Sequence, residues 1–350
     1  MSFFKSRVLM FVAAAAVAAP MFAAGPVSTE IEPVQPFLKS TQNVDVVFSM
    51  TNTSDRPVSV LRWNTPFDGI EGNLFEVARN GELVPYLGIE YKRGVPQRSD
   101  FMILSPGETV SALVELSGSY EMSYGGEYVV RFRNVSHHHS PMKGMGAEHL
   151  DLTSNRAVIW IDGEEAPILN NPYPVAAPTK AKPVRESCDN SQKAIIADAM
   201  AEAQNIAGIA ASYLGSTNSS SQRYAEWFGA YSSGRWSTVR SNFDAIDDAL
   251  NNAPVEFDCK CKQRYYAYVY PAEPYKIYLC KAFWSAPLTG TDSKAGTIVH
   301  EISHFNVVAG TDDVTYGQSS CRSLADSNPN DAIRNADSHE YFAENTPYLP

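Results

Sequence analysis

The segment GTIVHEISHFNVVAGTDDVTYG, residues 296–317, carries the pattern that decides the fold of the C-terminal half. His300 and His304 stand four residues apart, with Glu301 beside the first. Residues four apart lie on one face of a helix, so both imidazoles can reach one metal ion. Zinc with an open fourth position lowers the pKa of a bound water to about 7, and a neighbouring glutamate can take its proton. The segment therefore predicts a helix that carries part of a hydrolytic zinc site.

Two histidines do not complete such a site, and the known zinc-protease patterns differ in the third ligand. A metzincin needs Gly and His where this chain has Val307 and Gly310, so that class is excluded. A gluzincin takes a glutamate from a later helix, for which Glu340 or Glu344 is available. Both glutamates remain candidates on this evidence.

The segment directly after the helix offers a nearer third ligand. Gly310 allows the chain to turn back, because glycine accepts backbone angles that other residues avoid. Asp312 or Asp313 can then bring a carboxylate onto the metal. The residues alone leave the choice between these aspartates and a later glutamate open.

The combination of HEISH with GTDDVTYG resembles the aspzincin signature, His-Glu-x-x-His with Gly-Thr-x-Asp-x-x-Tyr-Gly. The similarity is to deuterolysin-type metalloendopeptidases, especially the peptidyl-Lys metalloendopeptidases, and covers residues 187–350. YAEWFGAY, FDCKC and NADSHEYFAEN resemble the same family. A β-rich segment ahead of the protease is similar to the secreted aspzincin toxins of aeromonads.

The resemblance implies a role for each residue of the motif. One Zn²⁺ per chain would be held by His300, His304 and Asp313. Glu301 would be the general base, and the Tyr316 hydroxyl would donate a hydrogen bond to the oxyanion of the transition state. Asp312 falls at the variable position of the motif and is not implied as a ligand.

The same resemblance implies a substrate preference. Asp337 and Glu340 stand three residues apart, which puts both carboxylates on one side of a helix. An arbitrary acidic pair is usually a solvated helix face, but peptidyl-Lys members use acidic residues here to bind the residue after the scissile bond (P1′). We therefore expect cleavage of X–Lys bonds. We also expect substitutions at this pair to leave the zinc content unchanged.

The N-terminus predicts export. Residues 1–24 combine Lys5 and Arg7 with an apolar run and small residues, as a signal peptide does. No later stretch reaches the roughly 20 apolar residues of a membrane span. The net charge of −11 disfavours a nucleic acid or an anionic membrane as partner. We expect a secreted, extracellular monomer that acts on proteins or peptides.

Export also favours disulfides over a cysteine metal site. The five cysteines all lie in the C-terminal half, at positions 188, 259, 261, 280 and 321. The resemblance implies the pairs Cys188–Cys259 and Cys261–Cys280. Cys321 is then left over, and we expect it to be a buried apolar residue.

The remainder of the chain divides in two. Residues 25–165 alternate apolar and polar positions at sandwich-like spacing, with a hairpin signal at Asn80–Gly81, and predict an all-β, sandwich-like domain. The resemblance implies that this domain is a propeptide. His137–His139 fit a solvated loop better than a metal site. Residues 166–187 form a proline-rich linker with the expected maturation bond Thr179–Lys180. Residues 188–350 predict an α+β, mostly helical, zincin-like protease domain.

We therefore expect a zinc metalloendopeptidase made as a zymogen, with its own propeptide as inhibitor. Two alternatives remain. One is a gluzincin with Glu340 as the third ligand. The other is a secreted binding module without catalysis, against which the intact Glu301 argues.

Overall fold

The computed structural model describes residues 25–136, 150–166, 187–216 and 221–350. The chain divides into two compact units, residues 1–88 with 96–170 and residues 89–95 with 171–350. The expected signal segment 1–24, His137–His139 and the expected maturation bond Thr179–Lys180 lie outside the described residues. Within the described ranges, no helix has the length and apolar content to cross a membrane.

The described part of the first unit contains β-strands and short 3-10 helices. Its strands are β1 (Val27–Pro33), β2 (Phe37–Lys39), β3 (Asp45–Asn52), β4 (Val58–Leu61), β5 (Phe75–Arg79), β6 (Glu82–Leu83), β8 (Phe101–Leu104), β9 (Thr109–Glu115), β10 (Gly126–Ser136), β11 (Leu150–Thr153) and β12 (Ala157–Asp162). The 3-10 helices are η1 (Arg62–Asn64), η2 (Pro66–Asp68) and η3 (Arg98–Asp100). The sheets have the orders β1-β3-β9, β2-β12-β10-β5-β6 and β4-β8, and β11 pairs with β10.

All three sheets contribute buried residues to one apolar core. Every second residue of β3 is buried, as expected for a strand with one face on a core. Phe48 of β3 lies 4.7 Å from Phe132 of β10, measured between ring centroids. The predicted hairpin is confirmed, because Asn80 and Gly81 both have positive φ between β5 and β6. The N-terminal half is therefore β-rich and sandwich-like, as predicted.

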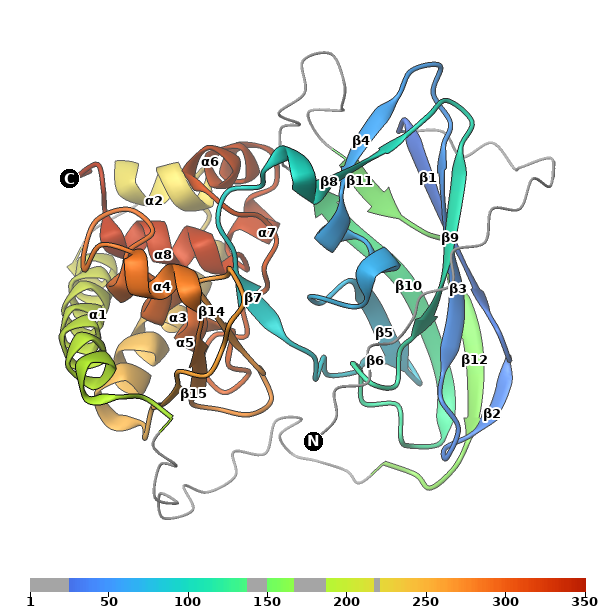
Figure 1. Ribbon diagram of the computed structural model, residues 1–350, viewed down its shortest axis with the longest axis horizontal. Helices are drawn as coiled ribbons and strands as arrows, with labels where there is room; N and C mark the ends of the chain where they lie inside the picture. Colours follow the sequence, from blue (N-terminus) through green and yellow to red (C-terminus); the bar gives the residue numbers. More distant parts are fainter. Residues whose placement is uncertain (1–24, 137–149, 167–186, 217–220) are drawn as a thin grey trace. The chain divides into compact units, whose positions relative to one another are not determined.

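The second unit is α+β and mostly helical, which confirms the prediction (Figure 1). Its helices are α1 (Asn190–Ser216), α2 (Gln222–Phe228), α3 (Ser233–Asn252), α4 (Lys281–Ser285), α5 (Lys294–His304), α6 (Gln318–Ser327), α7 (Pro329–Ala332) and α8 (Ala336–Glu344). Its strands are β7 (Glu90–Lys92), β13 (Glu256–Asp258), β14 (Ala267–Val269) and β15 (Lys276–Leu279), in the order β13-β15-β14-β7.

The helical segment after α1 is interrupted between α2 and α3. The break follows Gly229, which has φ 77°. A Cβ at this position would lie 2.3 Å from the Ala325 carbonyl oxygen, so the close approach requires glycine. Ser232 is extended, and α3 then begins at Ser233.

Helix α5 is the buried centre of the second unit. Ser293 caps its start by accepting a hydrogen bond from the Gly296 N–H at 2.9 Å. Gly296 also permits close packing against α8, since a Cβ there would lie 2.1 Å from a Glu344 carboxylate oxygen. Every residue of α5 is buried, so its side chains are held firmly.

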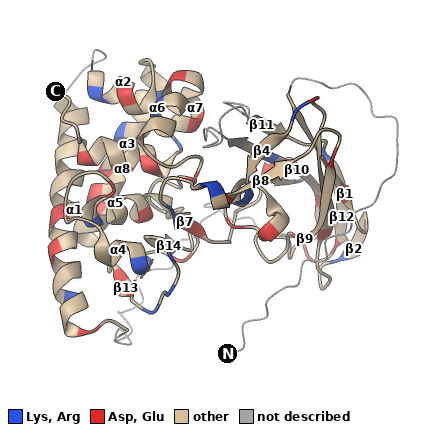
Figure 2. Ribbon diagram, turned by 45° about the horizontal axis from the view of Figure 1, so that its top comes forward, with Lys and Arg blue, Asp and Glu red and all other residues tan. Residues whose placement is uncertain are grey.

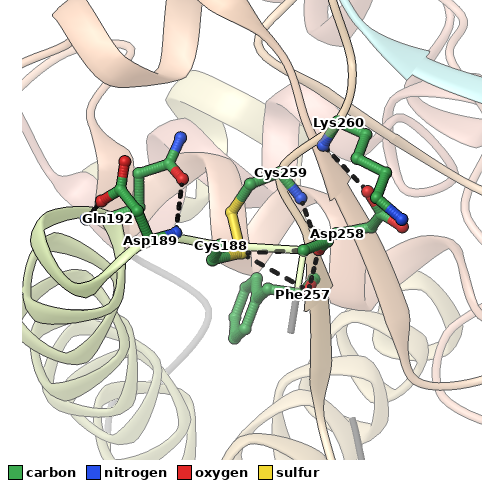
Figure 3. The surroundings of a disulfide bond; sticks show 8 residues. Cys188, Asp189, Gln192, Phe257, Asp258, Cys259 and Lys260 are labelled. Carbon is green, nitrogen blue, oxygen red and sulfur yellow. Dashed lines mark hydrogen bonds between the residues drawn. A yellow bond between two sulfur atoms is a disulfide. The ribbon is translucent and has the colours of Figure 1, made fainter. Parts of the chain in front are cut away.

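Two disulfides link the segments around this helical core. The first joins Cys188 to Cys259 and ties the residues before α1 to those after β13 (Figure 3). The second joins Cys261 to Cys280. Both expected pairs are confirmed. Cys321 is a free, buried thiol on α6, also as expected.

One strand of the second unit comes from the N-terminal half of the sequence. β7 pairs antiparallel with β14, with Glu90, Tyr91 and Lys92 opposite Val269, Tyr268 and Ala267. Figure 1 shows β7 in teal beside β14. The expected domain limits placed residues 89–95 with the β-rich half. Strand pairing over a long sequence separation explains the difference, because no local pattern signals it.

We predict that Cys321 is chemically silent in the native protein. The side chain is completely buried, and burial raises the pKa of its thiol well above the usual range. A thiol reagent should label no site in the native chain and one site per chain in denaturant without reductant. A Cys321→Ala variant should show no labelling in either condition. Rapid labelling of the native wild type would contradict the prediction.

Candidate metal centre and active site

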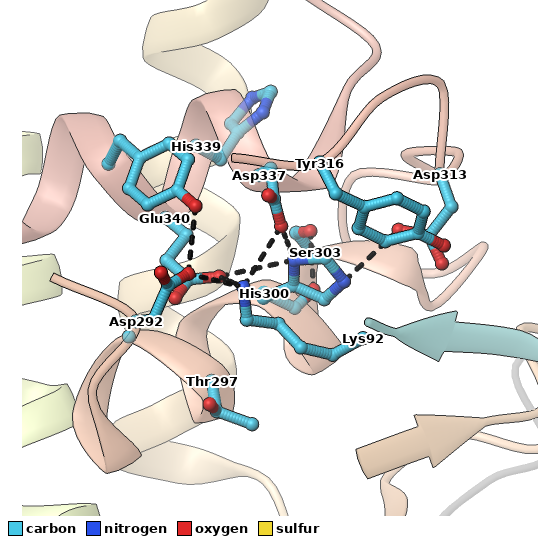
Figure 4. Close-up of polar contacts among 12 residues, drawn as sticks. Lys92, Asp292, Thr297, His300, Ser303, Asp313, Tyr316, Asp337, His339 and Glu340 are labelled. Atoms are coloured by element: carbon cyan, nitrogen blue, oxygen red, sulfur yellow. Dashed lines mark hydrogen bonds and ion pairs between the residues drawn. The ribbon is translucent and has the colours of Figure 1, made fainter. Parts of the chain in front are cut away.

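Two histidines of helix α5 lie close to one aspartate of the following loop. Figure 4 shows the first of them, His300, with Asp313. His300 Nε2 lies 3.2 Å from Asp313 Oδ1, and His304 Nε2 lies 3.6 Å from the same oxygen. The three ligand atoms lie within 4.8 Å of one another, and both histidines are completely buried. The structure thus gathers the three residues implied as zinc ligands.

Polar contacts accompany the orientation of each imidazole. His304 Nδ1 lies 2.8 Å from the Thr311 carbonyl oxygen, so it carries the proton and donates. His300 Nδ1 lies 3.0 Å from Asp337 Oδ1, within ion-pair distance. In both rings Nε2 faces Asp313, while Nδ1 contacts another oxygen, an arrangement that metal-bound histidines adopt.

The donor set fits a zinc ion. His304 Nε2 and Asp313 Oδ1 are buried and have no hydrogen-bond partner among the residues that the structure describes. A buried polar atom without a partner is costly, and a metal ion would satisfy both. Two imidazole nitrogens and one carboxylate oxygen match the ligands of catalytic zinc, which keeps a fourth position open.

The loop after α5 distinguishes the two neighbouring aspartates. Gly310 has φ 56°, and the Thr311 N–H donates to the Ser303 carbonyl oxygen at 3.1 Å, which turns the chain back along the helix. The Asp312 carboxylate forms an ion pair with Arg334. Asp313 instead points to the histidines, so the motif aspartate is the one placed for a metal.

Glu340 and Glu344, the alternative third ligands, lie on a different side of the site from Asp313. Glu340 Oε2 is 3.3 Å from His300 Nδ1, the nitrogen that faces away from Asp313. Glu344 accepts hydrogen bonds from the backbone N–H and the hydroxyl of Ser293. The geometry therefore favours Asp313 over Glu340 as the third ligand.

Glu301 and Tyr316 lie next to a peptide group of β7. Burial raises the pKa of Glu301 well above the usual range, and His300, the Lys92 ammonium and the nearby Lys92 backbone N–H offset part of that rise. The Tyr316 hydroxyl donates to the Tyr91 carbonyl oxygen at 2.8 Å. Burial also raises the pKa of Tyr316, so this hydroxyl remains a donor. The two side chains thus reach the nitrogen and oxygen sides of one peptide bond.

The predicted acidic pair holds a buried lysine. Lys92 Nζ lies 2.7 Å from Glu340 Oε2 and 3.1 Å from Asp337 Oδ1, and all three side chains have no exposed surface. Figure 2 marks α8, which carries both acidic residues, in the second unit. The carboxylates therefore form a pocket of the size and charge that a lysine side chain needs.

Three further residues of this pocket were not predicted. Asp292 Oδ1 lies 3.2 Å from Lys92 Nζ and accepts a hydrogen bond from the Tyr341 hydroxyl. The Tyr266 and Tyr341 rings lie 5.3 Å and 5.7 Å from the ammonium, within cation–π distance. Asp292 lies directly before Ser293, the residue that caps the start of α5. This position is the only feature of the local sequence that could have identified Asp292 as part of the pocket.

Substitutions at the acidic pair were expected to leave the zinc content unchanged, but the contacts of Asp337 argue against this for that residue. One of its oxygens contacts both Lys92 Nζ and His300 Nδ1, and the other accepts from the Gly317 N–H at 2.8 Å. A substitution at Asp337 would therefore disturb the orientation of a metal-site histidine as well as the lysine contact.

Comparison with known proteins agrees with this geometry. The aspzincin family, described as lysine-specific metallo-endopeptidase, matches residues 213–344. An extracellular protease of Aeromonas hydrophila is 43% identical over 348 residues, which is 98% of this chain and 99% of that protein. A peptidyl-Lys metalloendopeptidase of Grifola frondosa is 35% identical over 87% of this chain and 89% of its own length. Another, from Pleurotus ostreatus, is 47% identical over 46% of this chain and 96% of its own length.

The similarity over nearly the whole length and the gathered motif residues lead to one assignment. The chain belongs to the aspzincin family of zinc metalloendopeptidases.

Proposed function

We propose that this chain is a secreted endopeptidase, made as a zymogen, that hydrolyses peptide bonds with lysine in the P1′ position. The observation that carries the specificity is the Lys92 ammonium, held by the carboxylates of Asp292, Asp337 and Glu340. Burial lowers the pKa of Lys92, but the three carboxylates outweigh this effect and raise it well above the usual range. The pocket therefore stabilises a cation. The lysine preference named for two relatives supports the same substrate class.

The proposed mechanism assigns one task to each side chain. His300, His304 and Asp313 would hold zinc, which when bound supplies a Lewis acid for the attack of water on the scissile carbonyl. Glu301 takes a proton from the attacking water and passes it to the leaving amine. The Tyr316 hydroxyl donates to the carbonyl oxygen, on which negative charge develops.

The Tyr91–Lys92 peptide group supports the proposed zymogen. Its carbonyl oxygen accepts from the Tyr316 hydroxyl, its nitrogen side faces Glu301, and the Lys92 side chain fills the acidic pocket. The Tyr91 N–H also donates to Asp313 Oδ2 at 2.8 Å. Residues 89–95 thus occupy the place of a substrate, and we propose that they inhibit the enzyme in its precursor.

The remaining parts of the proposal concern secretion and proteolytic maturation of the precursor. Residues 1–24 would direct secretion, and residues 25–165 would be the propeptide. A cut at Thr179–Lys180 within the linker 166–187 would release the protease domain 188–350, which retains the metal site and both disulfides. The Pleurotus relative, whose length corresponds to about half of this chain, supports an enzyme of that size.

Asp313→Ala should abolish both zinc binding and activity, because it removes one of three ligands. Zinc content after desalting, measured by atomic absorption, tests this directly. Asp312→Ala is the matched control, since Asp312 is adjacent but pairs with Arg334. Glu340→Ala should retain zinc. If Glu340→Ala loses zinc and Asp313→Ala retains it, the gluzincin alternative is correct.

Glu301→Gln should keep zinc and the fold but lower kcat by a factor of about 10² to 10⁴, the usual contribution of a general base. Amide and carboxylate have nearly the same shape, so packing around this buried residue is preserved. Peptide hydrolysis and zinc content should be measured on the same preparation. If more than about a tenth of the activity remains, Glu301 is not the base.

Asp292→Asn should lower kcat/KM for lysine substrates by roughly tenfold without loss of zinc, because one charge-assisted contact is removed. Asp292 contacts the lysine ammonium and Tyr341, and its contacts with Lys92 do not involve His300. Asp326→Asn makes the same chemical change on an exposed position of α6 and serves as the control. An unchanged kcat/KM for Asp292→Asn would remove this residue from the pocket.

Lys92→Ala should make the uncut precursor active, since the inhibitory strand loses its anchor in the acidic pocket. The measurement uses a precursor with Lys180→Ala and Lys182→Ala, which should resist processing, and gel electrophoresis confirms that the chain stays intact. Lys39→Ala, an exposed lysine of β2, is the control. Equal latency of the Lys92→Ala and Lys39→Ala precursors would refute the inhibitory role.

A further inference from the structure

Residues 91–93 present their side chains to opposite sides of strand β7 and the segment that follows it. Successive residues of an extended strand point to opposite faces. Lys92 points into the acidic pocket, while Tyr91 and Arg93 both contact Tyr265. Tyr91 stands where the residue before the scissile bond (P1) would lie, and Arg93 where the second residue after it (P2′) would lie. The residues that contact Tyr91 and Arg93 therefore indicate which substrate side chains would bind on either side of the lysine.

Aromatic rings surround the Tyr91 side chain. Its ring centroid lies 4.8 Å from that of Tyr265 and 5.7 Å from that of Tyr268, at interplanar angles of 59° and 50°. Tyr268 is itself held by stacking on Tyr278, at 4.5 Å between centroids and 2° between planes. Stacking on Tyr278 therefore holds the Tyr268 ring in position.

The Arg93 side chain shares one of these rings. Its guanidinium carbon lies 4.6 Å from the Tyr265 ring centroid and 4.7 Å from that of Tyr91. Arg93 is 3% exposed, so the contact is largely desolvated. A planar guanidinium stacks on an aromatic face better than a compact ammonium does. Tyr265 thus contacts side chains on both sides of the lysine position.

We propose that Tyr265 and Tyr268 determine specificity beside the lysine. Tyr268 and Tyr265 bind an aromatic side chain at P1, and Tyr265 also binds arginine at P2′. The substrate class that fits best is a peptide with the order aromatic–lysine–arginine, cut between the first two residues. This inference rests on the proposed function, because it takes the strand of residues 89–95 as a stand-in for a substrate.

The test compares matched peptides on the processed enzyme obtained from the full-length precursor. All peptides carry lysine at P1′ and differ at P1 (Tyr or Ala) or at P2′ (Arg or Gln). Tilted aromatic pairs of this kind predict a kcat/KM for Tyr at P1 about two- to tenfold above that for Ala. Arg at P2′ should be preferred over Gln by about twofold or more.

Variants assign each preference to a side chain. Tyr268→Ala should reduce the P1 preference alone, whereas Tyr265→Ala should reduce both preferences. The phenylalanine variants at both positions should retain them, because the ring and not the hydroxyl makes the contact. Tyr231→Ala, at an exposed tyrosine between α2 and α3, is the control. Each preference is measured as a ratio of kcat/KM values for two peptides on one enzyme preparation. A lower fraction of active enzyme therefore does not change the ratio.

The possible results separate this inference from the proposed function. If lysine at P1′ is required but the residues at P1 and P2′ have no effect, the subsite proposal is wrong and the proposed function stands. If the enzyme cuts equally well without lysine at P1′, the proposed function fails. If the P1 preference exists but survives in both alanine variants, other residues form the subsite and the assignment to Tyr265 and Tyr268 is overturned.

Discussion

The contact between His300 and Asp337 connects the two halves of the active site. His300 Nδ1 lies 3.0 Å from Asp337 Oδ1, and this orients the ring so that Nε2 faces Asp313. The same aspartate oxygen lies 3.1 Å from the Lys92 ammonium. A single buried carboxylate thus positions a metal-site histidine and binds a cation. The metal site and the lysine pocket cannot change independently, although they perform different tasks.

The local part of this arrangement follows from sequence spacing. The four-residue interval between His300 and His304 and the turn at Gly310 bring Asp313 to both histidines within one helix and its following loop. The three-residue interval between Asp337 and Glu340 likewise puts both carboxylates on one side of α8. Short-range helical geometry is nearly the same in every protein, so the spacing alone predicts that the two histidines share a face and that the two carboxylates share a side. The choice of Asp313 and the role of the acidic pair were expected from the family resemblance.

The non-local part could not be predicted in that way. Lys92 is 200 residues from Asp292 and 245 residues from Asp337 along the chain. Its strand is three residues long and carries no periodic pattern that distinguishes it from the strands of the β-rich unit. The pairing of β7 with β14 depends on backbone hydrogen bonds, which any sequence can form. The third carboxylate and the aromatic rings around the ammonium depend on the same long-range packing and were missed for that reason.

The buried acidic pocket requires a cation to balance the charge of its carboxylates. Asp337 and Glu340 are completely buried, and burying two like charges without a partner is strongly unfavourable. An ammonium ion between them removes most of this cost, and the enclosed setting favours a compact cation. In the structure the chain itself provides that cation through Lys92. After the proposed maturation a substrate lysine would take its place, so the electrostatic requirement that holds residues 89–95 would be the same one that selects the proposed substrate.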